Sequence, residues 1–151
     1  MSQKFIYLFL FIFFNIFCFS QKEKQITKID SLLKISDMYI NIDFEKSLIF
    51  ADKALIEAKK QNNSNGRAQA DYYAAKSLIF FRQFEKGSQY IEKGLQEDAL
   101  KKNIQLKALF LILQHTYYSR MSLFEQSYGN LQKALFLLKS KNDIESKLLV
   151  S

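Results

Sequence analysis

The stretch Asp43-Phe44-Glu45-Lys46-Ser47 recurs twice in this chain, as Gln83-Phe84-Glu85-Lys86-Gly87 and as Leu123-Phe124-Glu125-Gln126-Ser127. Successive copies are 40 residues apart and align without gaps. A further small residue follows each phenylalanine by ten positions, and these residues are Ala54, Gly94 and Ala134. A fixed period of this size is typical of stacked repeat proteins, in which each unit buries its apolar face against its neighbours.

The small residues of the repeat lie on the same helix face as its phenylalanine. Ser47 and Ala54 follow Phe44 by three and ten residues, and ten residues are close to three turns of about 3.6 residues each. Small side chains at two points of one stripe let another helix approach closely. We therefore expect each copy to form the second helix of a hairpin, with the phenylalanine at the corner where the chain turns back.

These motifs resemble the tetratricopeptide repeat family. The family pattern has a turn of the type Gly-Asp-Tyr-Glu-Lys-Ala and a second helix that ends in Lys-Ala-Leu. Asp43-Phe44-Glu45-Lys46-Ser47 matches the turn, and Lys53-Ala54-Leu55 and Lys133-Ala134-Leu135 match the helix end. The resemblance is to the long-period type found in exported bacterial proteins. It implies an all-α fold, in which three antiparallel helical hairpins form a right-handed α-solenoid.

The chain also departs from the family pattern. The small residue of the family's first helix falls on Ala75 in the second copy, but on Ile35 and His115 in the other two. The period is 40 residues, whereas about 34 is usual. The resemblance covers residues 24–140, and the longer period indicates elongated first helices.

The periodicity and the loop composition predict how the chain is divided. Residues 1–20 are expected to be a signal peptide, residues 21–142 to hold the repeats, and residues 143–151 to begin a further helix. The predicted repeats are 24–61, 65–101 and 104–140. The predicted helices are 22–40, 44–61, 67–81, 85–101, 104–121 and 125–139. The polar stretch 61–66 is expected to be a loop.

The N-terminal residues favour export to the periplasm or cell envelope. Lys4 precedes the uncharged apolar run Phe5–Phe14, and Cys18-Phe19-Ser20 offers small residues where a signal peptidase cleaves. We expect cleavage after Ser20. The alternative is an uncleaved membrane anchor, although residues 5–20 are shorter than a typical span of about 20 residues. Cys18 is the only cysteine, so cleavage would leave no thiol chemistry.

Composition and motifs argue against nucleic-acid binding and against catalysis. The formal charge is +7, but lysines are mixed with acidic residues along the helical segments, and arginine occurs only at Arg67, Arg82 and Arg120. His115 is the only histidine, and we expect it to be a partly buried structural residue. No phosphate-binding loop, HExxH, GxSxG or EF-hand motif is present. The sequence therefore predicts no catalytic residue, no metal site and no cofactor.

The resemblance implies that a partner would bind in the groove lined by the first helices of the hairpins. The candidate groove residues are Tyr39, Gln69, Tyr72, Lys76, Ile112, Thr116 and Arg120, with Leu32 and Ser36 as further members. The tyrosines suit either the core or the groove. Only Lys76 fits the family's clamp for a terminal carboxylate, so that binding mode is rejected.

Two functions are compatible with these observations. The first is a non-catalytic, exported module that binds a protein or peptide. The alternative is the truncated periplasmic sensor portion of a signalling protein of the family that the repeats resemble. Such a protein would be a histidine kinase or a transcriptional regulator. We also expect the face formed by the last two helices to be only partly covered. That face would include Phe110, Leu131, Leu135 and Leu138, and its exposure would favour self-association.

Overall fold

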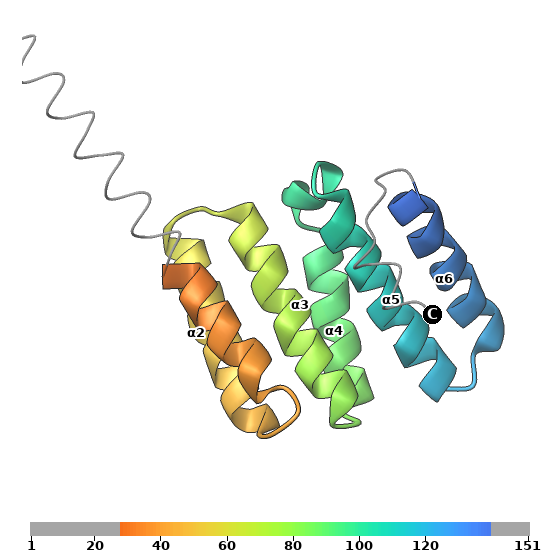
Figure 1. The fold of residues 1–151 in the computed structure, drawn as a ribbon, viewed down its shortest axis with the longest axis horizontal. Helices are drawn as coiled ribbons and strands as arrows, with labels where there is room; N and C mark the ends of the chain where they lie inside the picture. The colour runs from red at the N-terminus through yellow and green to blue at the C-terminus, as the bar shows by residue number, and fades with distance from the viewer. Residues whose placement is uncertain (1–27, 140–151) are drawn as a thin grey trace, which may run out of the picture.

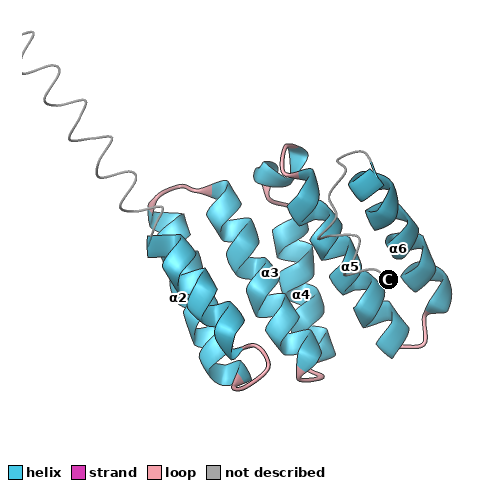
Figure 2. Cartoon of the chain, in the orientation of Figure 1, coloured by secondary structure: helices cyan, strands magenta, loops and turns pink. Residues whose placement is uncertain are grey.

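A computed structural model describes residues 28–139, which form helices and turns without a β-strand (Figure 2). Residues 28–39 are helical. After them come α2 (Phe44–Lys60), α3 (Ser64–Phe80), α4 (Phe84–Leu95), the short 3₁₀ helix η1 (Asp98–Lys101), α5 (Ile104–Arg120) and α6 (Phe124–Lys139). The predicted all-α fold class is confirmed for this part of the chain.

The helices lie side by side in a row, with residues 28–39 at one end and α6 at the other (Figure 1). α2 packs against α3, α3 against α4, and α5 against α6. α5 also contacts both α3 and α4, which joins the last helix pair to the one before it. The hydroxyl of Ser36 donates to the backbone oxygen of Ser47 over 2.9 Å, linking residues 28–39 to α2.

The small residues of the repeat are buried where helices approach each other. Ala54 and Ala134 are fully buried, and Gly94 lies against the ring of Phe110. A Cβ atom built on Gly94 would overlap that ring, so only glycine fits between α4 and α5. Although glycine within a helix costs up to about 1 kcal/mol relative to alanine, here it allows a fully buried phenylalanine to fill the core.

Asparagine and aspartate side chains begin three of the helices. Asp43 accepts a hydrogen bond from the amide of Lys46, as its position in the repeat predicts for an N-cap. Asn63 and Asn103 cap α3 and α5 in the same way, by accepting from Gly66 and Leu106. These caps accept hydrogen bonds from amides in the first helical turn that would otherwise lack a partner.

Two predicted boundaries in the middle of the chain are wrong. Residues 64–66 were expected in a loop, but they form the first turn of α3 because the Asn63 cap starts the helix early. The fourth helix was expected to reach residue 101, but α4 ends at Leu95. Glu97 is extended, with φ −69° and ψ 131°, and the chain then continues as η1.

The expected exposed face is also partly wrong. Phe110 and Leu138 are buried, because Phe110 packs against Gly94 and Leu138 packs between α5 and α6. Leu135 is exposed as expected, and Leu131 is partly buried. The most exposed apolar side chains of α6 were not predicted, and they are Phe124, Tyr128 and Phe136, which are 68%, 62% and 76% exposed. Self-association through this end of the molecule stays a prediction.

His115 is partly buried, as expected, and connects α5 to α6. Its Nδ1 atom lies 2.8 Å from the hydroxyl of Ser127, and that hydroxyl is also 3.1 Å from the backbone oxygen of His115. The proposed signal peptide, its cleavage at Ser20 and the further helix after residue 142 lie outside the described residues. Within residues 28–139, no helix has the length and hydropathy that crossing a membrane requires.

Candidate functional site

A cavity of about 360 Å³ opens between the C-terminal halves of α3 and α5. We call it the groove cavity. Its lining consists of Lys76, Ile79, Phe80, Arg82, Leu113, Thr116 and Arg120. Three of the seven groove candidates from the sequence, Lys76, Thr116 and Arg120, therefore meet in one place, although 40 or more residues separate Lys76 from the other two.

The turn after α3 places Arg82 in this cavity. Arg82 has a φ of 62°, in the left-handed region that usually favours glycine. The amide of Gln83 donates to the Leu78 carbonyl over 2.8 Å and the amide of Arg82 to the Ile79 carbonyl over 3.1 Å, which closes the helix end. Ser122 adopts the same conformation after α5, with a φ of 59°. The left-handed turn thus recurs in the third copy, whereas only the second copy has an arginine at this position.

Three cationic side chains and one large aromatic side chain give the groove cavity its character. Lys76 pairs with Asp37 over 3.1 Å, and its amine also lies 5.9 Å from the centre of the Tyr73 ring. Within residues 28–139, neither Arg82 nor Arg120 forms an ion pair. Two guanidinium groups are therefore available to an anionic ligand.

Phe80 supplies an apolar surface beside these charges. It is the last residue of α3 and is 58% exposed, while its ring makes an edge contact with Phe81 at 5.4 Å. The hydroxyl of Thr116 donates to the Ile112 carbonyl of its own helix over 3.0 Å, so its hydrogen is not available to a ligand. The cavity therefore combines positive charge with apolar contact.

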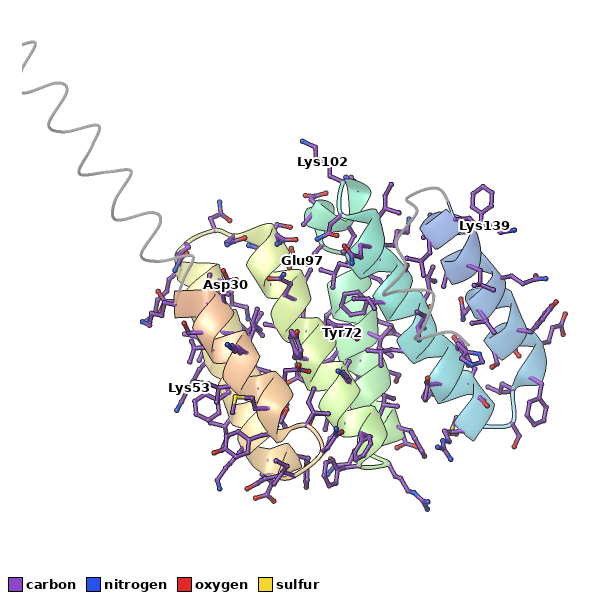
Figure 3. All side chains as sticks on the ribbon, viewed as in Figure 1. Asp30, Lys53, Tyr72, Glu97, Lys102 and Lys139 are labelled. Atoms are coloured by element: carbon purple, nitrogen blue, oxygen red, sulfur yellow. The ribbon has the colours of Figure 1, made fainter. Side chains whose placement is uncertain are left out.

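The other four groove candidates lie outside this cavity. Tyr39 stacks on Phe50 with 6.2 Å between ring centres. Tyr72 points from α3 toward α5, where its ring meets Phe110 edge-on at 5.6 Å (Figure 3). Burial raises the pKa of Tyr72 above its usual range, so its hydroxyl stays protonated at neutral pH.

Ile112 and Gln69 are partly buried at other points of the helix row. Ile112 packs against the apolar cluster between α5 and α6. Ser36, a further candidate, is fully buried, does not line the groove cavity, and donates its hydroxyl hydrogen to Ser47. Leu32 packs against a core cluster. The groove candidates thus separate into three that line the cavity and others that lie elsewhere along the helix row.

Sequence reasoning missed Phe80 and Arg82 as site residues. The pattern assigned Phe80 to the apolar face of its helix, and Arg82 belongs to a turn. The signal that could have found Arg82 is its position one residue before the repeated motif, where the copies otherwise carry Ile42 and Ser122. A lone cation at that position is a feature of one copy and not of the repeat.

Neither a metal site nor a known relative adds evidence about the function of the groove cavity. Within the described residues there is no group of three or more His, Cys, Asp or Glu side chains that could hold a metal ion. No protein-family model, curated protein or solved structure matches the chain.

Proposed function

We propose that this chain is a non-catalytic, exported binding module of the tetratricopeptide repeat type, built as a right-handed α-solenoid. In this proposal the groove cavity holds an acidic segment of a partner protein. The observation that carries it is the convergence of Lys76, Thr116 and Arg120 with Arg82 in one cavity. The signal-peptide pattern of residues 1–20 supports export.

The chemistry of the cavity supports an acidic and partly apolar ligand. Arginine binds carboxylates through two parallel hydrogen bonds, and Arg82 and Arg120 are both exposed. Phe80 offers the kind of exposed ring that apolar ligand residues cover. A segment with one or two carboxylates next to a large apolar side chain would contact both features.

The identity of Arg82 supports a role in binding. Arg82 brings a cation to the lining of the cavity, whereas the aligned positions of the other copies hold Ile42 and Ser122. The left-handed conformation recurs at Ser122, so it belongs to the turn, and the charge alone supports binding.

A pull-down from a cell-envelope extract tests the proposal. The double variant Arg82→Ala/Arg120→Ala should lose a partner that the unchanged protein retains, with binding at least about tenfold weaker. The matched control is Lys102→Ala/Lys139→Ala, which removes two exposed cations (Figure 3). Lys102 lies at the end of the molecule opposite to the α3–α4 turn (Figure 3).

Two further observations would decide the outcome. Binding through the arginines should weaken as salt rises from low to physiological concentration, because exposed charges are screened. A partner that both double variants retain equally would show that the groove cavity is not the binding site. A reproducible lack of any protein partner would contradict the function itself.

A further inference from the structure

A second cavity, of about 630 Å³, lies between α2, α3 and α4 and shares no lining residue with the groove cavity. We call it the polar cavity. Its lining includes Leu55, Lys59, Asp71, Tyr90, Lys93 and Glu97. Glu97 lies near the N-terminal end of α3 (Figure 3). The volume falls within the range of about 300–1,000 Å³ that small-molecule sites occupy.

Asp71 is the unusual member of this lining. Its side chain is only 4% exposed, and within residues 28–139 its Oδ1 atom has no hydrogen-bond partner. A buried carboxylate without a partner destabilises a fold. The repeat does not require it, because the aligned residue 40 positions later is Leu111, which is buried in an apolar cluster.

Two hydrogen-bond donors in the same lining, Arg67 and Tyr90, already have other partners. Arg67 donates to both carboxylate oxygens of Glu97, each over 2.7 Å, and Ser64 donates to the same carboxylate over 2.9 Å. The Tyr90 hydroxyl donates to Asp52 over 3.3 Å. Arg67 therefore does not form an ion pair with Asp71, because its guanidinium is bound to Glu97.

Positive charge is nevertheless present in the lining of the cavity. Lys59 of α2 and Lys93 of α4 both line it and are both exposed. Lys93 places its amine 5.1 Å from the centre of the Tyr90 ring. The lining of the cavity thus combines a buried carboxylate on α3, two exposed lysines on α2 and α4, and the partly buried side chains of Leu55 and Tyr90.

We infer that the polar cavity binds a small zwitterion, namely an amino acid or a short peptide with free termini. Its ammonium group would donate to Asp71, and its carboxylate would accept from Lys59 and Lys93. Its side chain would lie against Leu55 and the ring of Tyr90. This site is independent of the proposed groove function, because the two cavities use different residues.

A chemical-shift titration of the purified protein with glycylleucine tests the inference. The dipeptide should shift the amide signals around Asp71 and Lys93. The N-acetylated dipeptide, which lacks the ammonium, and the C-terminal amide, which lacks the carboxylate, should each bind at least about tenfold more weakly. Free leucine distinguishes an amino acid from a peptide as the preferred form.

Variants assign the binding to named side chains. Asp71→Asn keeps the side-chain shape and should weaken glycylleucine binding about tenfold or more. Lys59→Gln/Lys93→Gln changes only exposed positions and should weaken it several-fold, which keeps the test valid if the Asp71 variant unfolds. Glu92→Gln, on the exposed face of α4, is the matched control and should bind as the unchanged protein does.

Three results would overturn the inference. The first is no shift at about 10 mM dipeptide, a test concentration of the order at which weak ligands bind. The second is equal binding of the acetylated and free dipeptides. The third is Asp71→Asn binding as tightly as the unchanged protein, which would mean that Lys59 or Lys93 itself neutralises Asp71 in solution.

Discussion

The polar cavity and a second hollow lie at equivalent places in two successive repeats, 40 residues apart, but their lining side chains differ in chemistry. The second hollow, about 500 Å³, is lined by Lys107, Leu111, Gly129, Gln132, Lys133, Phe136 and Leu137. We call it the apolar cavity. Arg67, Asp71, Lys93, Gln96 and Glu97 of the polar cavity align with Lys107, Leu111, Lys133, Phe136 and Leu137.

This alignment separates what the repeat determines from what individual residues determine. Each hollow forms where a first helix is flanked by the second helix of its own hairpin, so it follows from stacking. The lining lysines Lys93 and Lys133 are common to both hollows. The acids Asp71 and Glu97 are replaced by Leu111 and Leu137, which join an apolar cluster with Ala134. The backbone repeats, and the side chains make one hollow polar.

The strongest test of this comparison moves the acid from one cavity to the other. Leu111→Asp should lower the free energy of unfolding by more than about 3 kcal/mol at pH 7, because it buries an unpaired charge among apolar side chains and removes leucine packing. Urea denaturation measures the change. Gln132→Asp, an exposed position in the same lining, is the control and should cost less than about 1 kcal/mol. Equal losses would mean that Leu111 is less buried than the structure shows.

The next test concerns two glycines of the second helices. Gly94→Ala should cost about 3 kcal/mol, because its Cβ would overlap the ring of the fully buried Phe110. Gly129→Ala should instead stabilise the protein by up to about 1 kcal/mol, because alanine favours the helix. Outside the backbone of its own helix, no atom lies within 4 Å of the position that the new Cβ would take. Thermal melting compares the two. A similar effect of both substitutions would contradict the close approach of α4 to α5.

The sequence predicted the repeated features of the fold because they depend on local spacing. The bounds of α2, α5 and α6 agree with the expected helices to within one residue, and the aligned Ala54, Gly94 and Ala134 are buried. Hydrophobic period, capping residues and small-residue spacing are local signals, and they act in the same direction in each copy.

The sequence could not predict features that depend on contacts between distant residues. α4 ends early where Glu97 turns away from the helix to meet Arg67 and Ser64, which are 30 and 33 residues earlier. The hydroxyl of Ser64 also accepts from the amide of Ala99 over 3.0 Å and so holds the start of η1. No local pattern in residues 85–101 signals these partners.

The candidate site was predicted only in part for the same reason. Lys76, Thr116 and Arg120 were candidates because the repeats resemble a known family pattern, and the structure places them in one cavity. Arg82 depends on a left-handed turn conformation that arginine does not suggest. Asp71 was missed because a charged residue within a helix is usually exposed, and only the packing of α2 and α4 around it reveals its burial.

The titration of Asp71 gives a smaller effect that depends on pH. Burial, and then the negative charge of Glu97, raise the pKa of Asp71 from 3.8 to about 6, while Lys59 and Lys93 oppose the rise and Asp52 adds to it. A raised pKa means that the folded state binds the proton more tightly than the unfolded chain. This carboxyl therefore destabilises the fold above pH 6, and the loss is relieved as the pH falls through 6 toward 4.

Asp71→Asn should remove this dependence. We expect the variant to be more stable than the unchanged protein by about 1–3 kcal/mol at pH 8, and by much less at pH 4. Denaturation of both proteins at several pH values isolates the contribution, because Glu97 and the other acids are common to them. A stability difference that does not change between pH 4 and pH 8 would show that the Asp71 carboxyl keeps an ordinary pKa.

The smallest predicted effect compares the two lining lysines. Lys93 lowers the pKa of Asp71, so Lys93→Gln should raise that pKa further in a carbon-13 titration of the Asp71 carboxyl. The folded charged form then becomes less favourable, and stability at pH 8 should fall by less than about 1 kcal/mol, with no loss from this source at pH 4.

Lys133→Gln, the aligned change, should leave stability within about 0.5 kcal/mol at both pH values, because Leu111 stands where Asp71 would be. If Lys133→Gln showed the same pH-dependent loss as Lys93→Gln, the effect would belong to the repeat and not to the buried acid. A loss confined to Lys93→Gln and to high pH would assign it to the electrostatic effect of Lys93 on the Asp71 carboxylate, the same two groups that the zwitterion is proposed to bridge.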